Sequence, residues 1–244
     1  MIDIVITMGG IGKRFRDVGY LIPKYMITAK DKTLFEWSLK SLDRLKGYIN
    51  KYIFVALEDN SIDINEFISS KCELLGIDSF EILILDKLTD GQATTALMAK
   101  EYWDKNNELL IYNIDTYVES GEIKYEDFHG DGFIPCFKAP GSHWSFVRLD
   151  DSGKVVEIKE KERISDNCTI GAYYFSSSEL YEKIYNRYYV ELKNNGVGTN
   201  NEKYIAPLYD YMINNDMEVY ISDIPSDKVH VLGTPEELND FINS

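Results

Sequence analysis

The sequence predicts an α/β protein in which helices pack on both faces of a mixed, mainly parallel sheet, giving three layers. Short apolar runs rich in β-branched residues alternate with helical patterns through the first half of the chain. Strands that alternate with helices form right-handed βαβ units, and such units build a parallel sheet. In the second half, two strand patterns around a short polar turn indicate a β-hairpin, which adds antiparallel strands.

The first half is expected to hold four strands and a well-defined helix. Residues 2–6 are almost continuously apolar and β-branched, which is typical of a strand buried on both faces. The other strands are predicted over residues 51–57, 80–85 and 108–115. Between the first two strands, residues 33–45 carry apolar side chains at helical spacing, and Thr33 with Glu36 forms a capping-box pattern at the start.

The second half is expected to hold the hairpin, one more strand and two helices. The hairpin covers residues 143–161 around the polar turn 150–153, and residues 169–175 form the further strand. The two helices are predicted to follow Ser176 and Thr234, because each of these residues has a glutamate three positions later.

Composition limits both the organisation and the partners of the chain. Its 244 residues are 44% hydrophobic and lack a long Ser/Gly/Pro tract, so we predict one domain over 1–244 with halves 1–120 and 121–244. A formal net charge of -15 disfavours a nucleic-acid partner. The three cysteines and three histidines show no metal-ligand spacing. The first apolar run is too short for a signal peptide or a membrane span, so we expect a soluble cytoplasmic protein without a membrane partner.

A glycine-rich turn directly follows the first strand. It fits neither common phosphate motif, because Arg14 stands where a P-loop needs Ser or Thr and Phe15 stands where a dinucleotide loop needs its third glycine. Glycine nevertheless lets backbone N–H groups approach an anion closely, and Arg14 and Lys24 add cationic donors. We therefore predict a phosphate-binding loop. Its residues are Met8, Gly9, Gly10, Ile11, Gly12 and Lys13.

This loop and the Pro23-Lys24 pair downstream resemble the signature of the nucleotidyltransferases that make nucleotide-activated sugars, choline or polyols from nucleoside triphosphates. Segments 89–97, 112–118 and 157–175 are similar to later segments of that family and occur in the same order. The resemblance implies a three-layer, Rossmann-like nucleotidyltransferase fold. It further implies that residues 1–120 bind the nucleotide and that residues 121–244, with the hairpin, bind a phosphorylated acceptor.

The same resemblance implies roles for individual residues. Gly91 and Gln92 would face the nucleobase, and Asp115, just past a buried strand, would bind Mg2+ as the cofactor. The residues implied in catalysis are Arg14, Lys24 and Asp115. The residues implied in acceptor binding are Asn113, Glu160, Lys161 and Gly171.

Each assignment has a structural alternative. Asp115 could cap the end of its strand, and Gln92 could simply begin a helix. Glu160 and Lys161 could belong to a solvated, charged strand end that protects a sheet edge.

One position departs from the family pattern. The family places a second metal-binding aspartate two residues before the glycine of a C-terminal Gly-Thr pair, and this chain has Val231 there. Either another carboxylate, such as Asp223 or Asp227, supplies the ligand, or Asp115 and substrate phosphates hold the metal alone. Mg2+ commonly binds through one or two carboxylates plus phosphates, so the substitution is compatible with activity.

The resemblance implies attack by an acceptor phosphate oxygen on the α-phosphorus of the triphosphate, with release of pyrophosphate. An ionised phosphate needs no general base, which agrees with the lack of a triad-like arrangement in the sequence. Asp86 occupies the position at which relatives place a glutamine that pairs with uracil or thymine. A carboxylate accepts from the amine of cytosine but cannot donate to a carbonyl, so we favour CTP over UTP and dTTP.

The second half resembles enzymes of bacterial capsule and surface-polysaccharide pathways, which leaves hexose 1-phosphates, polyol phosphates and phosphocholine as acceptors. Two rival functions stay open. A GT-A-like glycosyltransferase would use a D-x-D motif, which Asn113 breaks at its first position. A catalytically silent, ligand-sensing subunit would account for Val231. The oligomeric state, a homodimer included, is also left open.

Overall fold

The structure is a computed structural model that describes residues 1–198 and 201–244. The strands of its main sheet are β1 (Ile2–Met8), β4 (Ile49–Leu57), β5 (Phe80–Leu85), β6 (Glu108–Asn113), β8 (Gly132–Lys138), β9 (Ser145–Leu149), β10 (Val155–Glu160), β11 (Asn167–Thr169), β12 (Ala172–Phe175) and β13 (Val219–Asp223). In the described residues these ten strands lie in the order β10-β9-β11-β8-β12-β6-β1-β4-β5, with β13 paired to β8.

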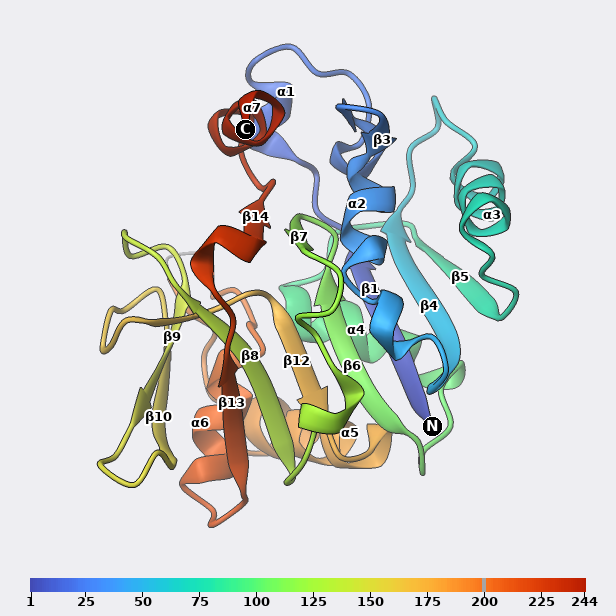
Figure 1. Cartoon of the computed structure of the whole chain (residues 1–244). Coiled ribbons are helices and arrows are strands. Elements are labelled where there is room, and N and C mark those ends of the chain that lie inside the picture. Colours follow the sequence, from blue (N-terminus) through green and yellow to red (C-terminus); the bar gives the residue numbers. More distant parts are fainter. Residues whose placement is uncertain (199–200) are drawn as a thin grey trace.

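The sheet is mixed, and most of its strands share one direction (Figure 1). Strand β1 pairs in parallel with β4 and β6, and β4 pairs in parallel with β5. Strand β12 runs antiparallel between β6 and β8, so β8 and its parallel neighbour β13 again point the same way as β1. The hairpin β9-β10 is antiparallel and joins the sheet through β11.

Helices cover both faces of the sheet, because the side chains of each strand alternate between two apolar cores. The helices are α1 (Lys13–Arg16), α2 (Leu34–Lys40), α3 (Ile64–Leu75), α4 (Gln92–Leu97), α5 (Ser178–Tyr185), α6 (Ala206–Ile213) and α7 (Pro235–Asn243). Ile4 of β1 packs in one core with Phe35 of α2 and Ile68 of α3. Val5, the next residue of β1, packs in the other core with Ala96 of α4 and Tyr209 of α6.

A third, smaller core packs the C-terminal helix against the segments that follow β1. It joins Phe15 of α1 and Trp37 of α2 to Leu238 and Phe241 of α7. Two short sheets lie beside it: β2 (Thr28–Ala29) with β3 (Lys32–Thr33), and β7 (Thr116–Val118) with β14 (Val229–Val231). In Figure 1 the C-terminal helix α7 consequently lies next to α1, which follows the glycine-rich turn.

Within residues 1–198 and 201–244, six short helical turns connect the main elements. Five are 3-10 turns: η1 (Lys24–Met26), η2 (Asp43–Leu45), η3 (Met98–Glu101), η4 (Tyr125–Asp127) and η6 (Ser226–Lys228). The sixth, η5 (Asn186–Glu191), is a wider π-helical turn that continues α5.

The predicted α/β class and the mixed, mainly parallel sheet are confirmed. The strands predicted over 2–6, 51–57 and 108–115 cover 2–8, 49–57 and 108–113, and three further elements differ in their boundaries. The predicted helix 33–45 starts with the expected capping box but ends at Lys40 and resumes as η2. Helix α5 is capped by Ser177, whose side chain accepts from Leu180 N, rather than by Ser176. The predicted strand 169–175 is interrupted at Gly171, whose φ of 81° is a conformation that L side chains rarely adopt.

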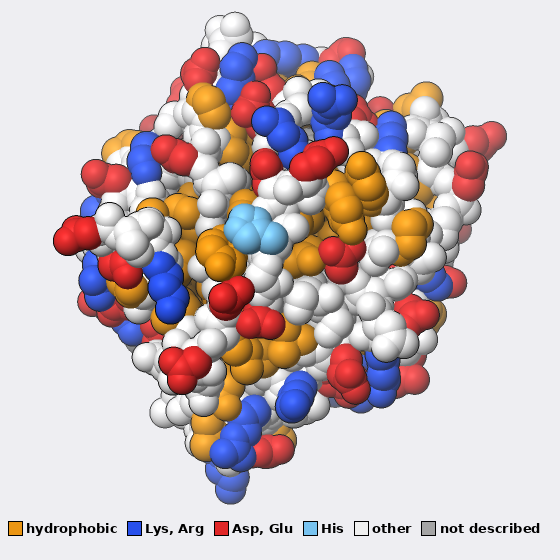
Figure 2. Space-filling view, turned by 60° about the horizontal axis from the view of Figure 1, so that its bottom comes forward, with side chains coloured by type: hydrophobic (Ala, Val, Ile, Leu, Met, Phe, Trp, Pro, Cys, Tyr) orange, Lys and Arg blue, Asp and Glu red, His pale blue; other side chains and the backbone are white. Residues whose placement is uncertain are grey.

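The surface carries charged side chains of both signs together with apolar side chains. On the face shown in Figure 2, acidic and basic side chains are interspersed around a central hydrophobic area. No helix within residues 1–198 and 201–244 is both long and apolar enough to cross a bilayer.

Candidate functional site

Two adjoining cavities lie at the carboxyl ends of the parallel strands β1 and β6, where open α/β sheets bind ligands. The larger, the loop cavity, has a volume of about 670 Å³ and is lined by residues 7–13 of the glycine-rich turn, with Lys24, Gly91 and Glu202 among others. The smaller, the hairpin cavity, has a volume of about 220 Å³ and is lined by residues on or next to β9, β10, β11 and β12, together with residues from the N-terminal half of the chain and from the segment after β13. Both are lined by Gln92, Asn113, Asp115 and Tyr204.

The glycine-rich turn takes a conformation that its glycines permit. Gly12 has a φ of 62°, and its carbonyl accepts from the backbone N–H of Phe15 and of Arg16 to start α1. The Arg16 side chain holds the turn from outside the cavity, since its Nε donates to the carbonyl of Ile11 at 2.9 Å. All six predicted loop residues line the loop cavity.

An ion pair stands where the two cavities meet. Lys24 begins η1 after Pro23, and its Nζ donates to Asp115 Oδ2 at 2.7 Å. Asp115 lies in the tight turn between β6 and β7, so its carboxylate projects past the end of the sheet. The side chains are only 19% and 29% exposed, so water screens the pair less than it would screen a surface pair.

A row of hydrogen-bonded residues lies where the two cavities meet. Gln92 is the first residue of α4. Its side-chain amide donates to Asn113 Oδ1 and, at 3.3 Å, to Thr7 Oγ1. The Asn113 backbone N–H donates to the Gly171 carbonyl at 3.1 Å. A Cβ on Gly171 would overlap the Asn113 side chain, so the interruption of the predicted strand at this glycine makes room for Asn113. The two interpretations of Gln92, helix start and site residue, therefore both hold geometrically.

Gly91 is required by a close backbone approach from a distant segment. The Lys203 backbone N–H donates to the Asp90 carbonyl at 2.7 Å, and the Ala93 N–H donates to the Lys203 carbonyl at 2.9 Å. Gly91 has a φ of 146°, and any Cβ there would overlap the Lys203 backbone. Through this contact the chain after α5 returns to the site and carries Tyr204 into both cavities.

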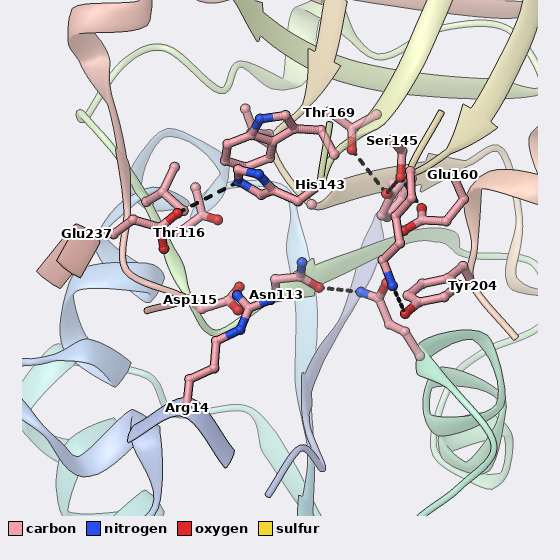
Figure 3. Close-up of a pocket in the computed structure, with 18 residues that line it drawn as sticks. Arg14, Asn113, Asp115, Thr116, His143, Ser145, Glu160, Thr169, Tyr204 and Glu237 are labelled. Atoms are coloured by element: carbon pink, nitrogen blue, oxygen red, sulfur yellow. Dashed lines mark hydrogen bonds and ion pairs between the residues drawn. The ribbon is translucent and has the colours of Figure 1, made fainter. Parts of the chain in front are cut away.

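The hairpin cavity is lined by hydroxyl and carboxyl groups (Figure 3). Tyr173 Oη lies 3.2 Å from Ser145 Oγ and 3.1 Å from Thr169 Oγ1. The Ser145 hydroxyl also donates to Glu160, and burial raises the pKa of the Glu160 carboxyl above its usual value. Lys161 is exposed at the rim and donates to Tyr204 Oη. Such a set of groups can bind the hydroxyls of a small polar ligand.

The raised pKa of Glu160 predicts a pH-dependent stability difference. Because the ionised carboxylate is disfavoured in the folded state, wild-type stability from this group falls as the pH rises through the folded pKa. Glu160→Gln cannot ionise, so the Tm of the variant relative to wild type should be higher at pH 7.5 than at pH 4. Thermal unfolding of both proteins across this range measures the difference, and a pH-independent difference would contradict the prediction.

The structure brings most of the predicted site residues together. Lys24, Asp115, Gly91, Gln92 and the turn residues line the loop cavity, whereas Arg14 lines the hairpin cavity and points toward Asp115 (Figure 3). The predicted acceptor residues Asn113, Glu160, Lys161 and Gly171 all line the hairpin cavity. Asp86 is exposed and lines neither cavity. The residue on which the preference for cytosine rests therefore does not reach the candidate site in this structure.

Several lining residues carry no sequence signal that points to a binding or catalytic role. They come from segments far apart in the chain, and single hydroxyl, aromatic and acidic residues are common everywhere. They are Thr7, Tyr25, Thr95, Thr116, His143, Trp144, Ser145, Thr169, Tyr173, Glu202, Tyr204 and Glu237.

The departure at Val231 is part of the site. Val231 lines the hairpin cavity and pairs with Thr116, so an aspartate there would lie close to Asp115. The suggested replacements do not reach it: Asp223 is exposed and pairs with Lys138, and Asp227 is exposed in η6. Among the described residues no three side chains of His, Cys, Asp or Glu converge as a metal cluster.

Comparison with known proteins agrees with this geometry. The family model described as nucleotidyl transferase matches residues 4–205. The chain is similar to the crystal structure of the nucleoside-diphosphate-sugar pyrophosphorylase from Vibrio cholerae RC9, with 32% identity over 100% of both chains and a TM-score of 0.87. It shares its fold with the inositol-1-phosphate CTP transferase from T. maritima, at 14% identity over 99% of this chain and 94% of the other, with a TM-score of 0.76. A search of curated proteins found no match. The match over most of its length, around a glycine turn and a Lys24–Asp115 pair in the expected places, shows that the chain belongs to the nucleotidyl transferase family.

Proposed function

We propose that this protein transfers a nucleotidyl group from a nucleoside triphosphate to a small phosphorylated acceptor and releases pyrophosphate. The observation that carries the proposal is the Lys24–Asp115 pair at the junction of two cavities of different character. The loop cavity presents glycine backbone suited to phosphates, and the hairpin cavity presents hydroxyl and carboxyl groups suited to a polyhydroxylated acceptor. The α-phosphate would lie between them.

The reaction is an in-line displacement. An oxygen of the acceptor phosphate forms a bond to the α-phosphorus, the bond from that phosphorus to the bridging oxygen breaks, and pyrophosphate leaves with the electron pair. Both reactants are anions, so the barrier is dominated by charge repulsion and alignment. Lys24, Arg14 and the turn amides supply positive charge and hydrogen bonds at the phosphates, and no proton has to be removed from the attacking oxygen.

A divalent cation such as Mg2+ fits this site on two observations. The Asp115 carboxylate faces the space beside Gly233, where a Cβ would lie 3.4 Å from Asp115 Oδ2. A second carboxylate oxygen, Glu237 Oε2, is buried beside the same space without a hydrogen-bond partner among the described residues. Asp115 would hold the ion together with the substrate phosphates, and the ion would supply charge neutralisation and orientation.

The finer specificity belongs to the same proposal. The 32% identity to a nucleoside-diphosphate-sugar pyrophosphorylase supports a sugar 1-phosphate before a polyol phosphate or phosphocholine. A product used for bacterial surface polysaccharides is proposed only on the resemblance of the second half of the sequence to enzymes of those pathways. CTP is proposed over UTP and dTTP on the chemistry of Asp86 alone. Because Asp86 is exposed outside the loop cavity, this choice requires the loop after β5 to approach the base when nucleotide binds.

Pyrophosphate release tests the proposal. The assay pairs each of CTP, UTP, dTTP, GTP and ATP with pools of sugar, polyol and choline phosphates in the presence of Mg2+. We expect release with one triphosphate that depends on one pool, with CTP the most active. Equal turnover with UTP would remove the cytosine assignment. Absence of release from folded protein that binds a nucleotide would favour a ligand-sensing subunit, for which Val231 is the supporting observation.

A further inference from the structure

We propose that Glu237, at the start of the C-terminal helix α7, supplies the second protein carboxylate of the divalent-cation site and so replaces the aspartate that Val231 lacks. The inference rests on the proposed function in taking the ion to be the one that accompanies the triphosphate. It concerns a residue that the sequence pattern explains only as part of a helix cap.

The backbone places Glu237 opposite Asp115. The Leu232 N–H donates to the Asp115 carbonyl at 2.8 Å, which fixes the segment after β14 against the turn that carries Asp115. Gly233 follows directly, and its missing side chain leaves a space between the two acids. A Cβ there would lie 3.4 Å from Asp115 Oδ2 and 3.5 Å from Glu237 Oε2, so both oxygens face the same small volume.

An internal comparison shows that the Glu237 side chain does not close a capping box. The Thr-x-x-Glu pattern occurs at Thr33 and again at Thr234. At the first, Glu36 turns back and accepts from the Thr33 backbone N–H at 2.9 Å, which closes the capping box. At the second, Thr234 accepts from the Glu237 N–H at 3.2 Å, but the Glu237 side chain extends into the hairpin cavity (Figure 3).

The surroundings leave one oxygen of Glu237 without compensation. His143 Nε2 lies 3.8 Å from Oε1 and can pair with it when protonated. Oε2 is buried and has no hydrogen-bond partner in the described residues, whereas Asp115 Oδ2 is bonded to Lys24. A buried carboxylate oxygen without a donor is costly, and a hard cation shared with a second carboxylate would satisfy it.

Binding of Mn2+ alone, as a probe for Mg2+, tests the site apart from turnover. Free Mn2+ is followed by its electron paramagnetic resonance signal during titration of wild type, Glu237→Gln, Asp115→Asn and Glu236→Gln. Glu236 is exposed on the same helical turn, and its substitution removes the same unit of charge, so it controls for non-specific attraction to an acidic protein. We expect Glu237→Gln and Asp115→Asn each to weaken the strongest Mn2+ binding by about tenfold or more, and Glu236→Gln to leave it unchanged.

A second readout uses folding. A cation that binds only the native state raises its Tm, so Mg2+ should stabilise wild type and Glu236→Gln but not Glu237→Gln. Gly233→Ala gives an independent variant, because its Cβ makes contacts of ordinary length in the protein without metal yet crowds an ion held by both acids. It should unfold near the wild-type temperature without Mg2+ and lose the Mg2+-dependent increase.

The outcomes separate this inference from the proposed function. Wild-type Mn2+ binding by Glu237→Gln, or no measurable Mn2+ binding by wild type up to millimolar concentration, would overturn the two-carboxylate site even if pyrophosphate is released. Loss of Mn2+ binding in Glu237→Gln alongside intact binding in Glu236→Gln would support the site even if no triphosphate is turned over.

Discussion

Lys24→Ala should abolish most of the transfer activity while the protein stays folded. The Lys24 ammonium lies at the junction of the two cavities, 2.7 Å from Asp115 Oδ2, where the reacting phosphates would meet. Loss of a preorganised charge at a developing anionic centre lowers kcat by about 10²–10³-fold. Pyrophosphate release at saturating substrates measures the effect, and far-ultraviolet circular dichroism verifies the fold.

Lys46→Ala is the matched control for this variant. Lys46 is an exposed lysine that pairs with Asp43 at 3.0 Å, away from both cavities. Its substitution removes the same charge and should leave kcat unchanged, since an exposed ion pair contributes about 0–1 kcal/mol to stability and nothing at the site. A Lys24→Ala protein that retained wild-type kcat would contradict the role of Lys24 at the reacting phosphates.

Among glycine-to-alanine substitutions in the site, Gly91→Ala should reduce stability or nucleotide binding the most. The added Cβ would overlap the Lys203 backbone, at a φ of 146° that alanine rarely adopts. Either the variant keeps the contact and loses at least about 2 kcal/mol of unfolding free energy, or the segment around Lys203 moves away and takes Tyr204 out of both cavities. Urea unfolding measures the first result, and weakened nucleotide binding measures the second.

Gly47→Ala tests whether the effect comes from the close approach. No atom lies within 4 Å of a Cβ built on Gly47, and its φ is not in the left-handed region. Its unfolding free energy should therefore stay within about 0.5 kcal/mol of wild type. If Gly91→Ala were equally neutral in stability and in nucleotide binding, the packing of residue 203 against the turn would have no functional importance.

Local patterns predicted most strands of the main sheet but, among the helices, only α2, α5 and α7, with α4 as an alternative for Gln92. Apolar runs identified β1, β4, β5 and β6. Most residues of β1 and β6 are buried, because a strand covered on both faces needs apolar side chains at nearly every position, whereas β5 is a half-exposed edge strand. The capping patterns located the N-cap residues of α2 and α7 correctly and that of α5 to within one residue. The missed interruption at Gly171 has a tertiary cause, since the chain bends there to avoid the side chain of Asn113.

The candidate site was predictable only in part. The glycine turn and Asp115 directly follow β1 and β6, so their place followed from the expected parallel sheet, whereas Lys24 lies in η1 and its place in the site was implied by the family resemblance. Asp86 follows a strand as well, but it is exposed outside both cavities, because a loop position does not fix the direction of its side chain. The hydroxyls of Ser145, Thr169 and Tyr173 form one cluster only because β9, β11 and β12 meet in the sheet.

The sequence by itself determined the α/β class, the glycine-rich turn after β1 and the place of Asp115 just past β6, because these depend on periodicity and turn chemistry over a few neighbouring residues. The tertiary structure alone decided which distant residues share the site: Lys203 against Gly91, Tyr204 in both cavities, and Glu237 across Gly233 from Asp115. Identical Thr-x-x-Glu patterns ended as a closed cap at Glu36 and as a cavity-lining carboxylate at Glu237. The difference arises from the packing of α7 beside the turn that carries Asp115, which no local pattern encodes.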